Sequence, residues 1–254
     1  MIRIHPFSAL RPSAEHAAEV ACDPYDVIST EEARERAEGK PNSFLHVVRS
    51  EIDLPAETDC HAAEVYQKAS DNLQAMIASG TLAREAAPSL YLYRQIREGA
   101  AQTGVVAFVE AEQYRTGEIR KHEKTRPDKE DDRTRHMLVT ASHAEPVFLC
   151  FRDQANDGQT VAQRMAADMT AEPLFDFVDP AGVQHTGWPV ADPAAYVAAF
   201  KGLERLYIAD GHHRSAGGER AATASQKANA AHTGNEEYTR FLAVIFPHDQ
   251  LRIL

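Results

Sequence analysis

The sequence contains little cysteine and no long apolar run, and these shortages exclude several classes of protein. Its 254 residues include three cysteines, at positions 22, 60 and 150, which are too few and too scattered for a disulfide framework or a zinc knuckle. The longest apolar runs, 147–151 and 241–246, fall far short of the ~20 residues that cross a bilayer. Because no basic region followed by an apolar segment opens the chain, we expect a cytoplasmic protein that does not interact with membranes.

Two motifs of common enzyme classes are also missing. The chain has no Gly-x-x-x-x-Gly-Lys-Ser/Thr loop, which excludes a P-loop kinase. The segment His122-Glu123-Lys124-Thr125-Arg126 begins like a zinc-protease motif but lacks the second histidine that would follow one helical turn later. A zinc protease is therefore excluded as well.

Positive charge is scarce overall but locally concentrated. The 27 Lys and Arg residues against 38 Asp and Glu give a net charge of −11, so we expect no nucleic-acid partner. Residues 120–135 nevertheless hold seven basic and five acidic side chains, a local charge of +2 that leaves −13 for the remainder. This basic island favours a small anionic ligand, such as a nucleotide or phosphate ester. A solvated, salt-bridged loop is the commoner explanation of such a run.

Hydrophobic residues make up 43% of the chain and charged residues 26%, which is ordinary globular usage. Apolar spacing and end signals predict helices over 31–38, 59–79, 134–142, 160–169, 192–201 and from 211 to 230. They predict strands over 2–7, 44–49, 89–96, 102–110, 146–152, 174–179, 203–209 and 241–246, with another beginning at 250–254.

This order of elements predicts an α+β fold with mixed or antiparallel sheets, hairpins and flanking helices. One hairpin joins the strands over 89–96 and 102–110. We expect an N-terminal α+β part over residues 1–118 and a phosphate- or nucleotide-binding part over 119–254, unless the two form one continuous domain.

The strongest local signal is Asp210-Gly211-His212-His213-Arg214, which joins a predicted strand to a predicted helix. Gly211 permits a sharp turn, and the start of the helix presents free backbone N–H groups to an anion. The two histidines and Arg214 add donors beside that point, and Asp210 could hold a divalent ion or orient an imidazole. The structural alternative is that Asp210 caps the helix and the histidines are surface residues.

The second signal is the start of the basic island, His122 to Arg126, which continues through Arg133. Its lysines, arginines and the Thr125 hydroxyl could grip phosphate oxygens, and Glu123 could serve as general base or metal ligand. Two weaker candidates for substrate contacts are a Pro-Tyr-Asp turn and a charged strand end. A purely structural turn explains the first equally well, and a solvated strand end explains the second better than a site does. They are Tyr25 with Asp26, and Arg49.

Taken together, these segments resemble the DUF1015 family of bacterial and archaeal cytoplasmic proteins. The shared landmarks, in order, are Pro24–Val27, His46–Glu51, His122–Thr125, Asp132-Arg133 and Ile208–Arg214. Members of that family are typically longer, so the resemblance implies that this chain lacks a C-terminal portion. The Asp-Gly-His-His-Arg segment also resembles the phosphate-binding box of the ParB/sulfiredoxin superfamily, which implies a ParB/sulfiredoxin-like element around residues 203–230.

That superfamily includes nucleotide-dependent kinases of free serine, and the resemblance implies roles for individual residues. Gly211, His213 and Arg214 would bind phosphate, while Asp210 and His212 would lie nearest the transferred phosphoryl group. The complete candidate set is catalytic Asp210, His212 and Glu123; phosphate- or nucleotide-binding Gly211, His213, Arg214, His122, Lys124, Thr125, Arg126 and Arg133; substrate-binding Tyr25, Asp26 and Arg49; and metal-binding Asp210.

Three functions are consistent with these candidates. The first is a small-molecule phosphotransferase that uses ATP or ADP, with Mg²⁺ at Asp210 and a hydroxyl acceptor such as free serine. The second is a nucleotide-binding switch without rapid turnover. The third is a metal-dependent phosphohydrolase whose ligands would come from His122, His136, Asp210, His212 and His213.

Overall fold

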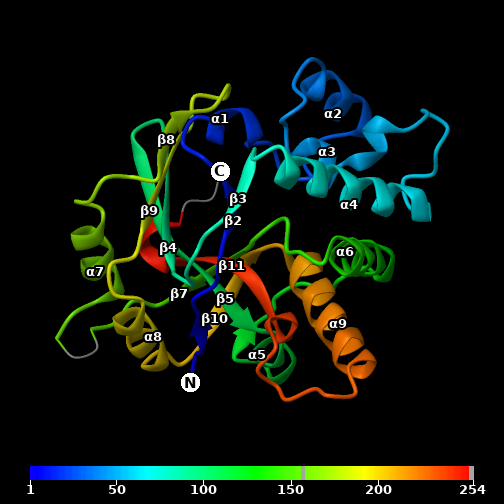
Figure 1. Ribbon diagram of the computed structural model, residues 1–254. Helices are drawn as coiled ribbons and strands as arrows, with labels where there is room; N and C mark the ends of the chain where they lie inside the picture. Colours follow the sequence, from blue (N-terminus) through cyan, green and yellow to red (C-terminus); the bar gives the residue numbers. More distant parts are fainter. Residues whose placement is uncertain (156–157, 252–254) are drawn as a thin grey trace.

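The computed structural model, which describes residues 1–155 and 158–251, has a mixed α+β fold built on a nine-stranded sheet (Figure 1). The strands of this sheet are β1 (Ile4–His5), β4 (Tyr91–Arg97), β5 (Ala100–Glu110), β6 (Ile119–Arg120), β7 (Val147–Phe151), β8 (Phe175–Val178), β9 (Gln184–Pro189), β10 (Leu206–Asp210) and β11 (Arg240–Pro247). A separate two-stranded sheet pairs β2 (Leu10–Pro12) with β3 (Leu82–Arg84).

Helices lie at both sides of the sheet. They are α1 (Ala17–Val20), α2 (Thr30–Ala37), α3 (Leu45–Val48), α4 (Ala63–Ala78), α5 (Ala111–Thr116), α6 (Pro127–Thr140), α7 (Val161–Asp168), α8 (Pro193–Lys201) and α9 (His212–Ala228). Short 3-10 helices are also present, at Ser50–Asp53, Glu237–Thr239 and His248–Gln250. Within the described ranges, no helix combines the length and the apolar character needed to cross a bilayer.

The strand order of the main sheet is β6-β10-β7-β11-β5-β4-β9-β8, with β1 also paired to β5. β5 is antiparallel to β4 and β11, whereas β7 is parallel to β11 and β6 is parallel to β10. β4 and β5, which precede residue 118, lie between β11 and β9, which follow it. The two predicted parts of the chain therefore share one sheet.

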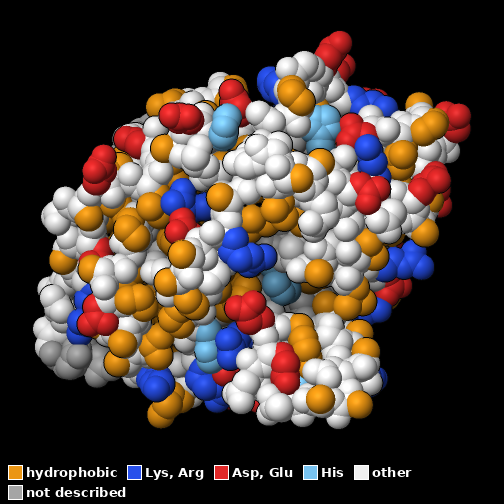
Figure 2. Space-filling model, in the orientation of Figure 1, with side chains coloured by type: hydrophobic (Ala, Val, Ile, Leu, Met, Phe, Trp, Pro, Cys, Tyr) orange, Lys and Arg blue, Asp and Glu red, His pale blue; other side chains and the backbone are white. Residues whose placement is uncertain are grey.

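The two faces of the sheet differ in what covers them. One face packs on α5, α7, α8 and α9 and forms the main core, with the fully buried Val105, Leu149 and Ile245 at its centre. The opposite face carries a smaller cluster with Phe7 and Tyr91 and is turned toward the N-terminal helices across two cavities. Figure 2 shows hydrophobic side chains gathered over the strands, while acidic side chains are prominent over α2 and α4.

Most predicted elements are confirmed, and several owe their ends to local side chains. The 89–96 and 102–110 hairpin is present as β4 and β5. The helix predicted over 31–38 is α2, whose first turn is held by a reciprocal capping box between Ser29 and Glu32. The predicted continuation at 250–254 lies, from residue 252 onward, outside the described residues.

Two predictions of secondary structure are wrong. Residues 44–49 do not form a strand: Leu45–Val48 is a short helix, because a brief apolar run packs equally well in either conformation. The predicted loop between 120 and 134 is helical from Pro127 onward, since a proline in the first turn and the acidic Asp128 and Glu130 favour a helix start there. Neither β9 nor α5 is among the elements predicted from the sequence.

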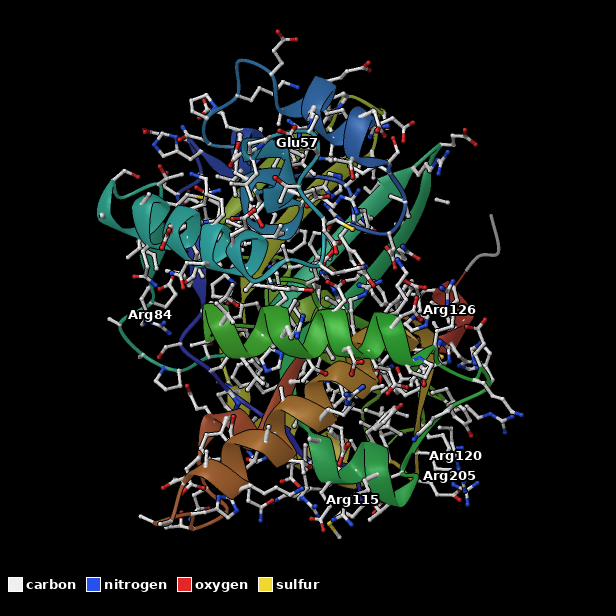
Figure 3. The ribbon with its side chains drawn as sticks, turned by 90° about the vertical axis from the view of Figure 1, so that its right-hand side faces the viewer. Glu57, Arg84, Arg115, Arg120, Arg126 and Arg205 are labelled. Atoms are coloured by element: carbon white, nitrogen blue, oxygen red, sulfur yellow. The ribbon has the colours of Figure 1, made fainter. Side chains whose placement is uncertain are left out.

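The long helices α6 and α9 pack closely, and α6 lies between α4 and α9 (Figure 3). A side chain at Gly217 of α9 would come within 3.0 Å of the Arg133 Cβ on α6, and one at Gly218 within 3.0 Å of the Phe241 Cβ on β11. Arg220 of α9 also forms ion pairs with Glu130 and Asp131 of α6. This close packing fixes the N-terminal ends of both helices relative to one another.

Candidate functional site

The two sequence motifs meet in space because of one strand pair. β6 and β10 are parallel, with Leu206 opposite Ile119, so both chains leave the sheet at the same edge and in the same direction. The loop after β6 contains His122–Arg126, and the turn after β10 contains Gly211 and begins α9. Residues 122–126 and 210–214 together are called the β10–α9 site below.

Three contacts join the halves of the β10–α9 site. The backbone N–H of Arg126 donates to Nε2 of His213 at 3.2 Å. A carboxylate oxygen of Glu123 lies 3.6 Å from Nδ1 of His212. The rings of His122 and His212 meet edge to face with their centres 4.4 Å apart. Figure 3 shows Arg126 at the end of α6 where this loop enters the helix.

The turn leaves backbone donors without a partner inside the helix. Gly211 is the N-cap of α9 and has a φ of +86°, a left-handed conformation that favours glycine. The N–H of Ser215 makes the first hydrogen bond within the helix, to the Gly211 carbonyl. The N–H groups of the three residues before Ser215 therefore have no partner within the helix. With the dipole of a 17-residue helix behind them, these groups favour an anion.

Arg214 connects this turn to other predicted residues. Its side chain is 7% exposed; Nη1 donates to the Pro146 carbonyl and Nη2 to the Asp210 carboxylate, both at 2.6 Å. The Asp26 carboxylate lies 3.9 Å from Nη2, which places the predicted Pro-Tyr-Asp turn beside the site. Asp210 does not cap α9, because the cap is Gly211 without a side-chain bond.

His212 is buried, and burial and the neighbouring His122 lower its pKa. Its imidazole is therefore neutral near pH 7, and its Nε2 atom has no hydrogen-bond partner in the part of the chain that the structure describes. Its other nitrogen faces Glu123, whose side chain is 62% exposed. A neutral imidazole beside an exposed carboxylate suits proton transfer or metal binding.

A three-donor cluster forms at the same place. His122, Glu123 and His212 each offer one ligand atom, and these atoms lie within 4.8 Å of one another. Two imidazoles and a carboxylate suit Mn²⁺, Fe²⁺ or Zn²⁺ better than Mg²⁺, which prefers oxygen ligands. Asp210, the predicted metal ligand, is not part of this cluster and is paired with Arg214.

Arg133 lies in a separate network that we call the Arg133 network. Its guanidinium bonds Asp132 at 2.7 and 2.9 Å and Glu145 at 3.1 Å, and its central carbon lies 3.7 Å from the centre of the Tyr25 ring. Tyr66 donates to Asp132 at 2.8 Å, so helix α4 is included. Arg133 is thus occupied by protein partners, whereas the first N–H groups of α9 make no bond within the helix.

Of the remaining candidates, Lys124 and Thr125 belong to the β10–α9 site and Arg49 does not. Lys124 is exposed, and the Thr125 hydroxyl donates to Glu130 of the next helix. Arg49 bonds Thr30 and faces Glu51 within the N-terminal helices, not at the β10–α9 site.

His136 and His143 do not share a helix face, because α6 ends before His143. His136 is buried with its Nε2 2.9 Å from the Val47 carbonyl, so it lies away from the other histidines of the predicted hydrolase. Burial lowers the pKa of each of these two histidines to about 4. Both are therefore neutral near pH 7; His136 is buried, whereas His143 is partly exposed.

Sequence reasoning missed Glu145. Its carboxylate accepts the backbone N–H of Tyr25 at 3.0 Å and also binds Arg133, and burial raises its pKa while Arg133 opposes the shift. A single glutamate two residues before the apolar strand β7 was the available signal. Together with the Pro146 carbonyl, it links the Arg133 network to Arg214.

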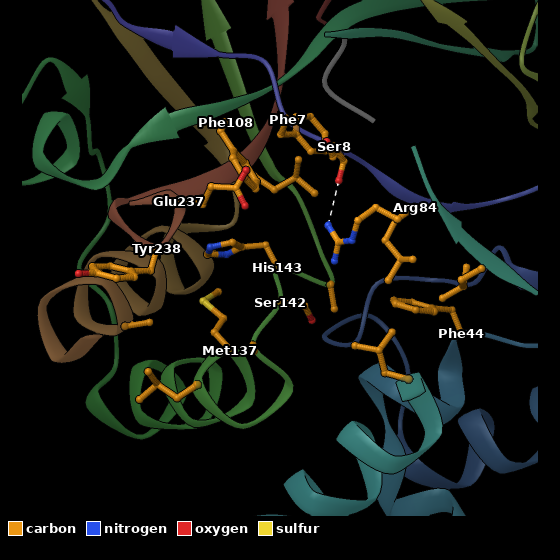
Figure 4. A pocket seen from close by; sticks show the side chains of 18 of the residues that line it. Phe7, Ser8, Phe44, Arg84, Phe108, Met137, Ser142, His143, Glu237 and Tyr238 are labelled. Atoms are coloured by element: carbon orange, nitrogen blue, oxygen red, sulfur yellow. Dashed lines mark hydrogen bonds between the residues drawn. The ribbon is translucent and has the colours of Figure 1, made fainter. Parts of the chain in front are cut away.

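Two cavities of ≈ 590 Å³ each lie beside the open face of the sheet. The first contains His143 and Glu237 and is crossed by a hydrogen bond from Arg84 to the Ser8 carbonyl (Figure 4); none of the predicted site residues lines it. The second is lined at one end by Asp210 and Arg214. It therefore opens onto the β10–α9 site.

Comparison with known proteins identifies a family. No curated protein and no solved structure matches this chain. One family profile, described as a protein of unknown function (DUF1015), matches residues 4–254 and so includes both halves of the β10–α9 site. The chain belongs to the DUF1015 family.

Proposed function

We propose that this chain is a nucleotide-dependent small-molecule phosphotransferase whose phosphates bind at the N-terminus of α9. The observation that carries this proposal is the meeting of the basic loop and the β10–α9 turn, with Arg126 and His213 only 3.2 Å apart. Backbone N–H groups, imidazoles and a guanidinium converge there, which is the donor set that phosphate oxygens require.

The reaction assigns a distinct task to each group. The hydroxyl oxygen of the acceptor, such as free serine, attacks the terminal phosphorus of ATP or ADP; the new O–P bond forms as the bond to the leaving nucleotide breaks. The Glu123 carboxylate, exposed and facing the site, accepts the hydroxyl proton. Helix α9 and Arg214 stabilise the negative charge on the transferred group.

A divalent ion would assist by neutralising phosphate charge. Mg²⁺ is commonly held by one or two carboxylates together with substrate phosphates, and Glu123 and Asp210 are the carboxylates that this site offers. The residues thus fit Mg²⁺ only when a phosphate supplies further oxygens. When bound, the ion would supply charge neutralisation.

The test is direct. Purified protein is incubated with ATP or ADP, Mg²⁺ and serine, phosphoserine is measured, and nucleotide affinity is determined by titration calorimetry. We expect phosphoserine, and its loss in His213→Ala. The matched control is His16→Ala, which removes an exposed histidine on the N-terminal side of α1. Absence of both product and nucleotide binding would refute the proposal, whereas tight binding without product favours the nucleotide-binding switch.

A second function is favoured by the cluster of His122, Glu123 and His212. Its donor set suits a transition metal, which would support a metal-dependent phosphohydrolase. His136, one of the five residues expected for that activity, is not part of this cluster: it is buried, and its imidazole contacts the Val47 carbonyl. Metal analysis of untagged protein distinguishes the functions: stoichiometric transition metal favours the hydrolase, and metal-free protein that binds ATP favours the phosphotransferase.

A further inference from the structure

The cavity that opens onto the β10–α9 site is polar at one end and aromatic along its length. Asp210, Arg214 and Glu145 line the polar end. The rest is formed by the open face of the sheet and by the N-terminal segments on either side of α1. Six of the ten phenylalanines in the sequence line it: Phe7, Phe44, Phe148, Phe175, Phe177 and Phe246.

Several of these rings are incompletely covered and held in fixed positions. Phe148 and Phe246 pack with their centres 4.6 Å apart, and Phe148 pairs with Asp210 across β7 and β10. At the other end, Phe177 stacks on His185 with the ring centres 5.1 Å apart, and the hydroxyl of Tyr93 bonds that imidazole at 2.6 Å. Phe148 and Phe177 are both partly exposed, so their rings remain available to a flat ligand.

The polar end is not fully satisfied by the protein. Arg214 is almost completely buried, yet its Nε atom has no hydrogen-bond partner within the described ranges. The cavity therefore combines a buried guanidinium, one nitrogen of which has no partner in the described part of the chain, with partly exposed aromatic rings. A ligand that matches both parts is an anion attached to a flat aromatic group, which free serine and its phosphate are not.

We infer that this cavity holds the base and ribose of the nucleotide whose phosphates bind at the N-terminus of α9; the inference rests on the proposed function. Bases stack on aromatic side chains without requiring a particular set of hydrogen-bond donors, which suits a cavity whose lining includes six phenylalanines. Phe148 on β7 and Phe177 on β8 belong to one sheet but are separated by four strands, so a single base stacks on one of these rings and not on both.

The experiment compares ATP with tripolyphosphate, which has the same phosphate chain but no nucleoside. Both are titrated by calorimetry into the wild type, Phe148→Ala and Phe177→Ala, and thermal unfolding confirms that each variant is folded. We expect ATP to bind at least about tenfold more tightly than tripolyphosphate, in line with the stacking of one base. Substitution of the ring on which the base stacks lowers the ATP affinity by about tenfold, and neither substitution changes the affinity for tripolyphosphate.

Phe108→Ala is the matched control, because Phe108 is partly exposed on the same face of the sheet but lines only the other cavity. We expect it to leave both affinities unchanged. Equal affinity for ATP and tripolyphosphate, unaffected by the two variants, would overturn the inference while the phosphate site of the proposed function stands. Failure of both ligands to bind would overturn the proposed function, and the inference with it.

Discussion

The β10–α9 site and the Arg133 network both take residues from the basic run 120–135, but their charges are paired differently. In the Arg133 network, the guanidinium is 8% exposed and bonded to two carboxylates. In the β10–α9 site, Glu123 is 62% exposed and the first N–H groups of α9 precede its hydrogen-bond ladder. The two regions thus differ in pairing rather than in density of charge: the charges of the Arg133 network are bonded to one another, whereas Glu123 is exposed and the first N–H groups of α9 make no bond within the helix.

Arg133→Gln tests the network most severely. It leaves Asp132 and Glu145 partly uncompensated in a buried place, so we expect the free energy of unfolding to fall by about 3–5 kcal/mol in urea denaturation. The control is Arg205→Gln, whose exposed pair with Glu204 contributes at most about 1 kcal/mol. If Arg133→Gln were as stable as the wild type but bound no ATP, Arg133 would belong to the ligand site, as the sequence predicts.

Acid should lower the free energy of unfolding through His136, which is buried near Arg133. The pKa of His136 is about 4 in the folded protein against 6.5 as the ordinary value, so the unfolded chain binds more protons between these values. The stability contributed by neutral His136 is complete above pH 6.5 and is lost as the pH falls toward 4, by up to about 1.4 kcal/mol per pH unit. His136→Gln should reduce this slope in urea unfolding from pH 7 to 5; an unchanged slope would contradict the assignment.

Gly211→Ala tests whether the turn serves binding as well as folding. The left-handed φ alone should lower the free energy of unfolding by about 1–2 kcal/mol. Gly234→Ala is a matched control, because Gly234 has a φ of +91° but no atom within 4 Å of a new Cβ, whereas the Arg214 Nε lies 3.1 Å from one at Gly211. ATP affinity should fall only in Gly211→Ala, and an equal loss in both variants would remove the turn from the site.

Glu123→Gln should have the smallest effect on stability. The side chain is exposed, so the free energy of unfolding, measured by urea denaturation, should change by less than about 0.5 kcal/mol. Loss of the general base should lower kcat by about 10²–10⁴-fold with little change in KM for ATP. Glu57→Gln removes another exposed glutamate (Figure 3) and should leave kcat unchanged. Wild-type kcat in Glu123→Gln would exclude Glu123 as the base.

The sequence predicted the α+β class and most elements because capping residues, glycine stops and alternation are local signals. It failed at 44–49 and at the start of α6, where tertiary packing and a proline at the helix start decided the conformation. The ParB/sulfiredoxin-like element and the two-part division of the chain stay predictions.

The candidate site was predictable only in pieces. The glycine, histidines and arginine of the β10–α9 turn gave a local signal, and the basic loop gave another, but their contact depends on the parallel pairing of β6 with β10. β6 is two residues long and carries no recognisable pattern. Arg126 and Arg133 belong to one basic run, but Arg126 is exposed and Arg133 is buried. The pattern of charges along a sequence does not reveal which side chains are buried.

The glycine contacts of α9 have a mechanical consequence. Because Gly217 and Gly218 let α6 and β11 approach this helix without intervening side chains, α9 has no room to slide or tilt between them. Its N-terminus is therefore preorganised, and an arriving anion need not reorganise it. Any closure around a ligand must come from the opposite wall, where α1 and its flanking segments border the aromatic cavity.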